Sequence, residues 1–353
     1  TTGSAGSGVV SVADSGHGAV ANDFVTLSAA TTTDGITAAQ LNTTHQIVTI
    51  TSANVYTVDT GGSASSGSTG GGGSSVEAQY EINTGLDVGV SGPGWGSSTW
   101  GRLTWGSSSS TDVDDSDQLR LWSQDSFGED LIFCVRDGGV YYWDKSDGTG
   151  ARAVALSSES GALDVPTIAR QVMISNNDRH VLAFGCNDRG ETTQDKLLIR
   201  WSDQENAVDW TPTTENTAGD VRLNNGSEII TAHETRQEIL VWTDATLNSL
   251  RFVGPPFTFG QNVIDGNTSI IAPNAVASLD EATFWMGNNN FYVYSGRVDT
   301  LPCTVRRYVF NDLNVSQKEK IFAGTNKEFN EIIWFYPSSS SEEIDRYVIF
   351  NTE

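Results

Sequence analysis

Basic side chains are scarce in this sequence. Its 353 residues include 20 Lys and Arg against 44 Asp and Glu, which gives a formal net charge of −24. Arg102 and Arg120 are the only basic residues before position 129. Binding to nucleic acid or to an anionic membrane surface by charge needs clustered Lys and Arg. The composition therefore argues against both kinds of ligand.

Cysteine is also rare, and long apolar runs are missing. Cys134, Cys186 and Cys303 are widely spaced without a CxxC motif, and the first two stand in the apolar runs LIFCV and LAFGC. This pattern predicts small buried side chains in a protein assembled in a reducing cytosol. No stretch of about 18 apolar residues occurs, so no membrane-spanning helix is predicted. The chain begins at Thr1 without Met or a visible signal peptide, and we expect it to be part of a longer protein.

Recognisable catalytic motifs do not occur either. The sequence has no HExxH, no GxSxG and no P-loop. Residues 16–21, GHGAVA, match GxGxxA, but the strand-like NDFVTLSAA follows, so no helix N-terminus is offered to a phosphate. The histidines are scattered, and we expect each at the surface or in a turn: His17, His45, His180 and His233. The sequence therefore predicts no enzyme and no cofactor.

One acidic run is a weak candidate for a metal site. Asp112, Asp114 and Asp117 belong to DVDDSD, whose alternating carboxylates could hold Ca²⁺. The run lacks the glycine at the sixth position and the downstream glutamate of an EF-hand loop. A solvated loop is the alternative interpretation.

What the sequence has in abundance is paired aromatic strands. The stretch EATFWMGNNNFYVYSG, residues 281–296, is two apolar runs around a polar turn and predicts a β-hairpin. Similar hairpins occupy 130–144, 180–202, 238–253 and 331–351, so their starts are 43 to 58 residues apart. Weaker strands between them bring each unit to about four strands, which is typical of a propeller blade.

The repeats predict an all-β protein with a β-propeller over residues 119–353. Five blades are visible, and because propellers close with about four to eight blades, closure can require strands from outside this stretch. Aromatic residues at similar points of the second hairpin strands should pack between neighbouring blades. These are Trp143, Trp201, Phe252, Tyr294 and Phe350.

The first third of the chain has a different composition. Residues 1–15 form a Gly/Ser-rich linker with a short strand, and 16–83 predict a small all-β module that carries a flexible Gly/Ser loop. Residues 84–118 form an arm rich in Trp, Gly and Ser. Its tryptophans, Trp95, Trp100 and Trp105, either pack on their own domain or contact a neighbouring subunit.

Four stretches of the sequence resemble components of phage tails. Three are similar to blade phrases of the nozzle or hub proteins of short-tailed phages: LWSQDSFGEDLIFCVRDGGVYYWD, residues 121–144, IRWSDQENAVDWTP, residues 199–212, and GSEIITAHETRQEILVWTDATLNSLRFVGPPFTFG, residues 226–260. Residues 16–59 resemble a small β domain of phage structural proteins, likened to the first catalytic-cysteine half-domain of ubiquitin-activating enzymes. No cysteine lies in that region, so ubiquitin chemistry is not implied.

The resemblance implies a non-enzymatic structural protein of a virion tail, assembled in the host cytoplasm. It implies a homo-oligomeric ring, with sixfold symmetry favoured, that retains DNA and lets it pass without specific binding. Portal, adaptor and tail-fibre proteins would be its neighbours. The alternative is a carbohydrate-binding or carbohydrate-degrading propeller, such as a tail-associated lectin or depolymerase.

Overall fold

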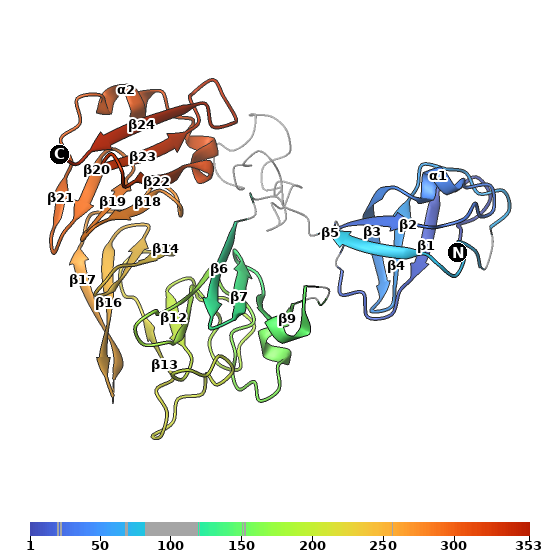
Figure 1. The fold of residues 1–353 in the computed structure, drawn as a ribbon, viewed down its shortest axis with the longest axis horizontal. Coiled ribbons are helices and arrows are strands. Elements are labelled where there is room, and N and C mark those ends of the chain that lie inside the picture. Colours follow the sequence, from blue (N-terminus) through green and yellow to red (C-terminus); the bar gives the residue numbers. More distant parts are fainter. Residues whose placement is uncertain are drawn as a thin grey trace, which may run out of the picture. The chain divides into compact units, whose positions relative to one another are not determined.

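The computed structural model divides the chain into two compact units, Thr1–Thr84 and Gly85–Glu353 (Figure 1). It describes residues 1–19, 21, 23–67, 70–81, 119, 121–149, 151, 153–255 and 257–353. The predicted arm at 84–118 lies outside the described residues, and with it the candidate subunit contacts Trp95, Trp100 and Trp105 and the candidate metal ligands Asp112, Asp114 and Asp117. No helix in the described part of the chain is long and apolar enough to cross a membrane.

The first unit is built on a five-stranded antiparallel sheet in the order β1-β4-β3-β2-β5. Its elements are β1 (Val9–Ala13), β2 (Phe24–Ser28), α1 (Ala38–Leu41), β3 (Thr44–Ser52), β4 (Val55–Asp59) and β5 (Glu77–Glu81). Because β1 pairs with β4, residues 1–15, which we expected as a separate linker, take part in this sheet. Ile36, Ile47 and Tyr56 are fully buried in its core.

The Gly/Ser loop of this unit is bonded to the rest of the unit at several points, and Asp34 makes the largest group of these bonds. The Asp34 carboxylate accepts hydrogen bonds from the backbone N–H groups of Ser66 (3.1 Å) and Gly67 (2.7 Å) and from the hydroxyl of Thr2 (2.8 Å). These donors, that of Thr2 first, hold the pKa of Asp34 below its ordinary value. The loop that composition alone marks as flexible is thus held by an acid more than 30 residues earlier.

The second unit is a β-propeller, as the repeats predict. It contains four sheets of four strands and one of three, each with its strands in sequence order. The first three sheets consist of β6 (Trp122–Phe127), β7 (Asp130–Val135), β8 (Val140–Trp143) and β9 (Val154–Ala155); β10 (Gln171–Ile174), β11 (Val181–Phe184), β12 (Leu198–Trp201) and β13 (Gly219–Arg222); and β14 (Ile229–Glu234), β15 (Ile239–Thr243), β16 (Leu247–Gly254) and β17 (Thr258–Asp265). The last two consist of β18 (Val276–Leu279), β19 (Ala282–Met286), β20 (Phe291–Tyr294) and β21 (Val298–Thr300), and of β22 (Phe322–Asn326), β23 (Glu331–Tyr336) and β24 (Arg346–Asn351).

The aromatic hairpins found in the sequence are the second and third strands of each sheet. Short helical segments join successive sheets: η3 (Leu156–Ser158), α2 (Arg306–Asn311) and η4 (Val315–Lys320); η2 (Lys145–Asp147) lies between β8 and β9 of the first sheet. The weaker strands between the hairpins, β10, β14 and β18, are the first strands of their sheets.

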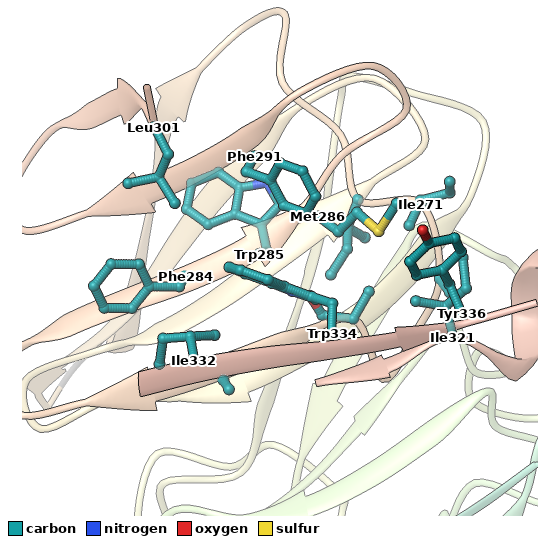
Figure 2. Close-up of a cluster of buried hydrophobic side chains, with 14 of the residues drawn as sticks. Ile271, Phe284, Trp285, Met286, Phe291, Leu301, Ile321, Ile332, Trp334 and Tyr336 are labelled. Carbon is teal, nitrogen blue, oxygen red and sulfur yellow. The ribbon is translucent and has the colours of Figure 1, made fainter. Parts of the chain in front are cut away.

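Aromatic side chains fill the spaces between neighbouring sheets. Between the fourth and fifth sheets, Phe291 packs on Trp334 with ring centroids 4.8 Å apart, and the Trp334 indole donates to the Ala275 carbonyl (3.0 Å). Figure 2 shows Trp285 and Trp334 inside this cluster, among other aromatic and aliphatic side chains. Burying such rings from both sides is the main way that each sheet is stabilised by the next.

Four of the aromatics selected from the sequence contact a neighbouring sheet. Trp201 of the second sheet meets Phe259 of the third at 5.1 Å, edge to face. Phe252 of the third sheet lies 5.8 Å from His180, and Phe350 of the fifth lies 5.9 Å from Phe284 of the fourth. The Tyr294 hydroxyl donates to Glu238 of the third sheet (2.6 Å).

Trp143 is placed differently. Its indole donates to the Ala151 carbonyl (3.2 Å), in the connection that follows its own strand, and the side chain is half-buried. By strand alternation it shares a face with Tyr141, on the side of the first sheet that points away from the second.

Replacing Trp201 by alanine should lower the free energy of unfolding by about 3–5 kcal/mol, because the side chain is 3% exposed and its indole also donates to the Thr217 carbonyl. Trp143→Ala is the matched control and should cost about 1 kcal/mol, since its face is only half-covered. Chemical denaturation followed by tryptophan fluorescence measures both. Equal losses for the two variants would contradict this account of the sheet interfaces.

Candidate functional site

The innermost strands of all five sheets surround one central cavity of about 500 Å³. Each sheet contributes its first strand or the residues just before it, so the cavity lies on the axis of the propeller. Its wall mixes polar and apolar side chains, among them Gln124, Asp125, Gln171, His233, Asn274 and Phe322. No Lys or Arg lines it. This cavity is the natural first place to look for a site in a propeller.

The inner edge of a sheet presents backbone groups that its own second strand cannot reach. On β10 these groups are covered by side chains of β6. The Val172 N–H donates to the Ser123 hydroxyl (2.9 Å), and the Ile174 N–H donates to the Asp125 carboxylate (2.9 Å). Two polar side chains of the first sheet therefore satisfy backbone N–H groups at the inner edge of the second sheet, as a neighbouring strand would.

The same arrangement recurs one sheet further on. The Gln171 side chain accepts from the Ala232 N–H (2.7 Å) and donates to the Ala232 carbonyl (2.8 Å), which satisfies both backbone groups of one residue in β14. It also accepts from the Thr231 hydroxyl (3.1 Å). Between β14 and β18, His233 Nε2 and the Ser278 hydroxyl are 2.8 Å apart.

The last two junctions use other groups. The Ala323 N–H of β22 donates to the Asn274 carbonyl (2.8 Å), a backbone bond that joins the fifth sheet to the start of the fourth. In the described residues no hydrogen bond links β22 to β6. Instead Arg136, after β7, pairs with Glu319 of η4 (2.8 Å) and donates to the Leu119 carbonyl (2.7 Å). The Arg136 side chain is 5% exposed and that of Glu319 is 33% exposed, so the guanidinium is shielded from solvent and the carboxylate is partly accessible.

Four polar side chains of the cavity, those of Ser123, Asp125, Gln171 and His233, are therefore used to join neighbouring sheets. A catalytic acid or base must have a proton-accepting or proton-donating atom directed at a substrate. Asp125, Gln171 and His233 instead direct theirs at neighbouring strands. The arrangement of these side chains in the cavity suits the joining of sheets better than it suits an active site.

A second hollow, which is lined by acidic residues, lies between the second and third sheets. It measures about 200 Å³ and its wall includes Asp178, Glu234 and Glu238. Burial raises the pKa of Glu234, which is a feature of many catalytic acids. Yet Glu234 accepts from the Asn176 N–H (2.8 Å), Asp178 from Ser175 (3.1 Å) and Glu238 from Tyr294 (2.6 Å). These carboxylates, too, link chain segments.

The burial of the histidines differs from what the sequence led us to expect. We expected them at the surface or in turns, but His17, His45 and His180 are buried and bonded. His180 Nε2 lies 2.9 Å from the Thr217 hydroxyl, and the ring packs against Phe252 and Phe259 of the next sheet. The sequence around His180 is not itself apolar on both sides, so only packing between sheets reveals this burial.

The thiols behave as the apolar runs around them predict. Cys134 and Cys186 are free and buried in the cluster between the first two sheets. Burial raises the pKa of each to about 12, so neither is a thiolate at neutral pH. Within the described part of the chain, no group of three or more His, Cys, Asp or Glu is gathered to hold a metal ion.

No protein-family model matches the sequence, and no curated protein matches it. Solved structures of the β-propeller type are similar to it. The AfRom2 CNH domain is 11% identical over 65% of this chain and 67% of that one, with a TM-score of 0.36. BamB from Moraxella catarrhalis is 12% identical over 62% and 59%, with a TM-score of 0.32. The phage phi92 endosialidase is 9% identical over 94% of this chain and 45% of its own, with a TM-score of 0.25.

These superpositions carry no argument about function. The chain also spans only 62% of the length of another similar structure, the computationally designed Ika8 protein, at a TM-score of 0.36. The assignment of the fold therefore rests on the sheets of this protein itself, and the inference of function rests on its own side chains.

Replacing Gln171 by leucine should destabilise the propeller by about 1–3 kcal/mol, because the N–H and carbonyl of Ala232 lose their partner. Gln124→Leu is the matched control: Gln124 lines the same cavity, is exposed and makes no hydrogen bond in the structure. It should stay within about 0.5 kcal/mol of the wild type. Thermal or urea unfolding compares them, and equal stabilities for the two variants would count against the role given to Gln171.

Acid should weaken the junction at His180. Burial lowers its pKa below the ordinary 6.5, so above that value the ring is neutral in both folded and unfolded chains. As the pH falls below about 6.5, the unfolded chain gains a proton that the folded protein does not, and stability is lost by up to about 1.4 kcal/mol per pH unit. His180→Gln should show a shallower slope of unfolding free energy between pH 7 and 5; identical slopes would contradict the assignment.

Proposed function

We propose that this protein is a non-enzymatic structural component of a phage virion, a tail nozzle or hub subunit. In this proposal several copies form a ring whose channel retains DNA and lets it leave during ejection. One observation carries the proposal: the side chains of Ser123, Asp125, Gln171 and His233 at the centre of the propeller bond neighbouring sheets, which favours a rigid building block over a catalyst. The blade phrases at 121–144 and 199–212 point to the same class of protein.

The charge distribution supports a role beside moving DNA. A wall rich in free Lys and Arg would release counterions from each phosphate and hold the duplex. Here most of the basic side chains in the described residues are paired with acids, for example Arg170 with Glu228, Arg222 with Asp195 and Lys320 with Glu343. With a net charge of −24, the surface repels phosphate within a screening length of about 8–10 Å.

A carbohydrate-binding or carbohydrate-degrading propeller is the second candidate. The observation in its favour is the acidic recess with Glu234, whose pKa is raised by burial. A glycosidase would need Glu234 free to protonate a leaving oxygen. Its two bonds to Asn176 favour the structural role instead.

We expect the assembled protein to form a closed ring, with sixfold symmetry favoured, whose channel wall is net acidic. Electron microscopy of the tail, or of the purified oligomer, would show the symmetry, the neighbouring portal, adaptor or tail-fibre proteins, and the charge of the wall. A ring with a neutral or basic wall and its acids on the outer rim would overturn the DNA-transit argument alone. A monomer absent from the particle, or hydrolysis of host polysaccharide that Glu234→Gln abolishes, would overturn the proposal itself.

A further inference from the structure

Two sheet faces in the propeller remain uncovered in the described residues. On the first sheet, the face that points away from the second carries Trp122, Phe133 and Tyr141. Their rings form a row with centroids 5.9 and 5.4 Å apart. Trp122 is 40% exposed, whereas the aromatic rings between other sheets, such as Trp285 and Trp334, are almost fully buried.

The fifth sheet has a matching open face. Phe322, Phe335 and Tyr347 stand side by side on β22, β23 and β24, with ring centroids 4.7 and 6.2 Å apart. Phe322 is 42% and Tyr347 64% exposed. The opposite face of this sheet, with Ile332 and Trp334, packs on the fourth sheet. Both open faces thus have the composition of an internal interface and lack the second half of one.

A recess lies between the fifth sheet and the segment that leads into the first. It measures about 540 Å³, with Phe322 and Ile344 on one side and Leu119 and Leu121 on the other. Asn274 and three charged residues complete the wall, and the charges are paired: Glu319 with Arg136, and Lys320 with Glu343. An element that entered this recess would meet apolar side chains on two sides.

The third sheet carries a projection of that kind. The β16–β17 hairpin extends beyond the rest of its sheet (Figure 1). Near its tip Val253 is 56% and Phe257 76% exposed. Residues 252–264 contain no charged side chain in a chain whose net charge is −24, and Arg251 at the base is paired with Glu238.

We propose that the tip of the β16–β17 hairpin of one copy docks into the recess between the fifth and first sheets of a second copy. Copies with this net charge repel each other, so a contact is favoured where charge is missing, and the hairpin offers an uncharged, apolar ribbon. Docking would bury Phe257 and Val253 against Phe322 of the recess and Tyr347 of the adjoining open face of the fifth sheet. The hairpin tip would fill the recess with an element that is apolar on both sides.

This contact joins two different surfaces, so it propagates from copy to copy. Such head-to-tail contacts produce a ring when the rotation closes and a filament when it does not. The inference rests on the proposed function, to which it adds the subunit contact. Because the driving force is apolar, association should persist or strengthen as salt screens the repulsion between acidic copies.

The test compares Phe257→Asp, which damages the hairpin, with Tyr347→Asp, which damages the open face of the fifth sheet beside the recess. Sedimentation velocity from 1 to 100 μM protein, roughly spanning the affinity of subunit contacts, should show wild-type oligomers and only monomers for each variant. A 1:1 mixture of the variants should form a dimer and nothing larger, since one intact hairpin meets one intact recess. Phe329→Asp, exposed in the turn between β22 and β23, is the control and should assemble as the wild type does.

The outcomes separate this inference from the proposed function. Circular dichroism and thermal unfolding should match in all variants, because each altered side chain is exposed. A wild-type protein that stays monomeric at every concentration and salt level overturns the docking. So does an oligomer that survives Phe257→Asp, or a mixture of variants that remains monomeric. In the last two cases a virion ring built through other surfaces would leave the proposed function standing.

Discussion

The inner edge of every propeller sheet carries backbone N–H and C=O groups that no strand of the same sheet can satisfy. Leaving such groups unpaired costs about 1–3 kcal/mol each when they are buried. This protein covers them with side chains of the preceding sheet: Ser123 and Asp125 cover β10, and Gln171 covers β14. The bonds fix the angle and height of each sheet relative to the next. The large aromatic interfaces further out can then form in one register only.

That use of polar groups also limits what the protein can do chemically. In many propellers the axis is open to ligands, but here Asp125, Gln171 and His233 are directed at neighbouring strands. Glu234, the carboxyl group whose burial most resembles that of a catalytic acid, is held by Asn176. An arrangement in which Ser123, Asp125, Gln171 and His233 are bonded to neighbouring strands favours stiffness over reactivity. This is the property that a channel subunit under load would need.

The five junctions between neighbouring sheets of the propeller are not alike. Four junctions between sheets are closed by side-chain or backbone bonds. In the described residues, the junction from the fifth sheet to the first depends on Arg136 and Glu319, and the aromatic faces on both sides of it are uncovered. The third sheet of the propeller also extends the β16–β17 hairpin, in which residues 252–264 carry no charge. An exposed apolar projection and an exposed apolar recess on one acidic subunit are physically related features, because both are surfaces on which copies do not repel each other.

The sequence determined the propeller, since hairpins at intervals of 43 to 58 residues are a local signal that survives in any context. It also selected Trp201, Phe252, Tyr294 and Phe350, because alternation along a strand assigns each side chain to a face. It could not place Trp143, whose face would need a preceding sheet to cover it, nor the buried His180, whose partners come from the next sheet. The covering of β10 and β14 was equally invisible, because Ser123 and Gln171 meet residues 49 to 61 positions away and no periodicity marks those pairs. Only the closing of the sheets around a common axis brings such residues together, and that depends on the tertiary structure.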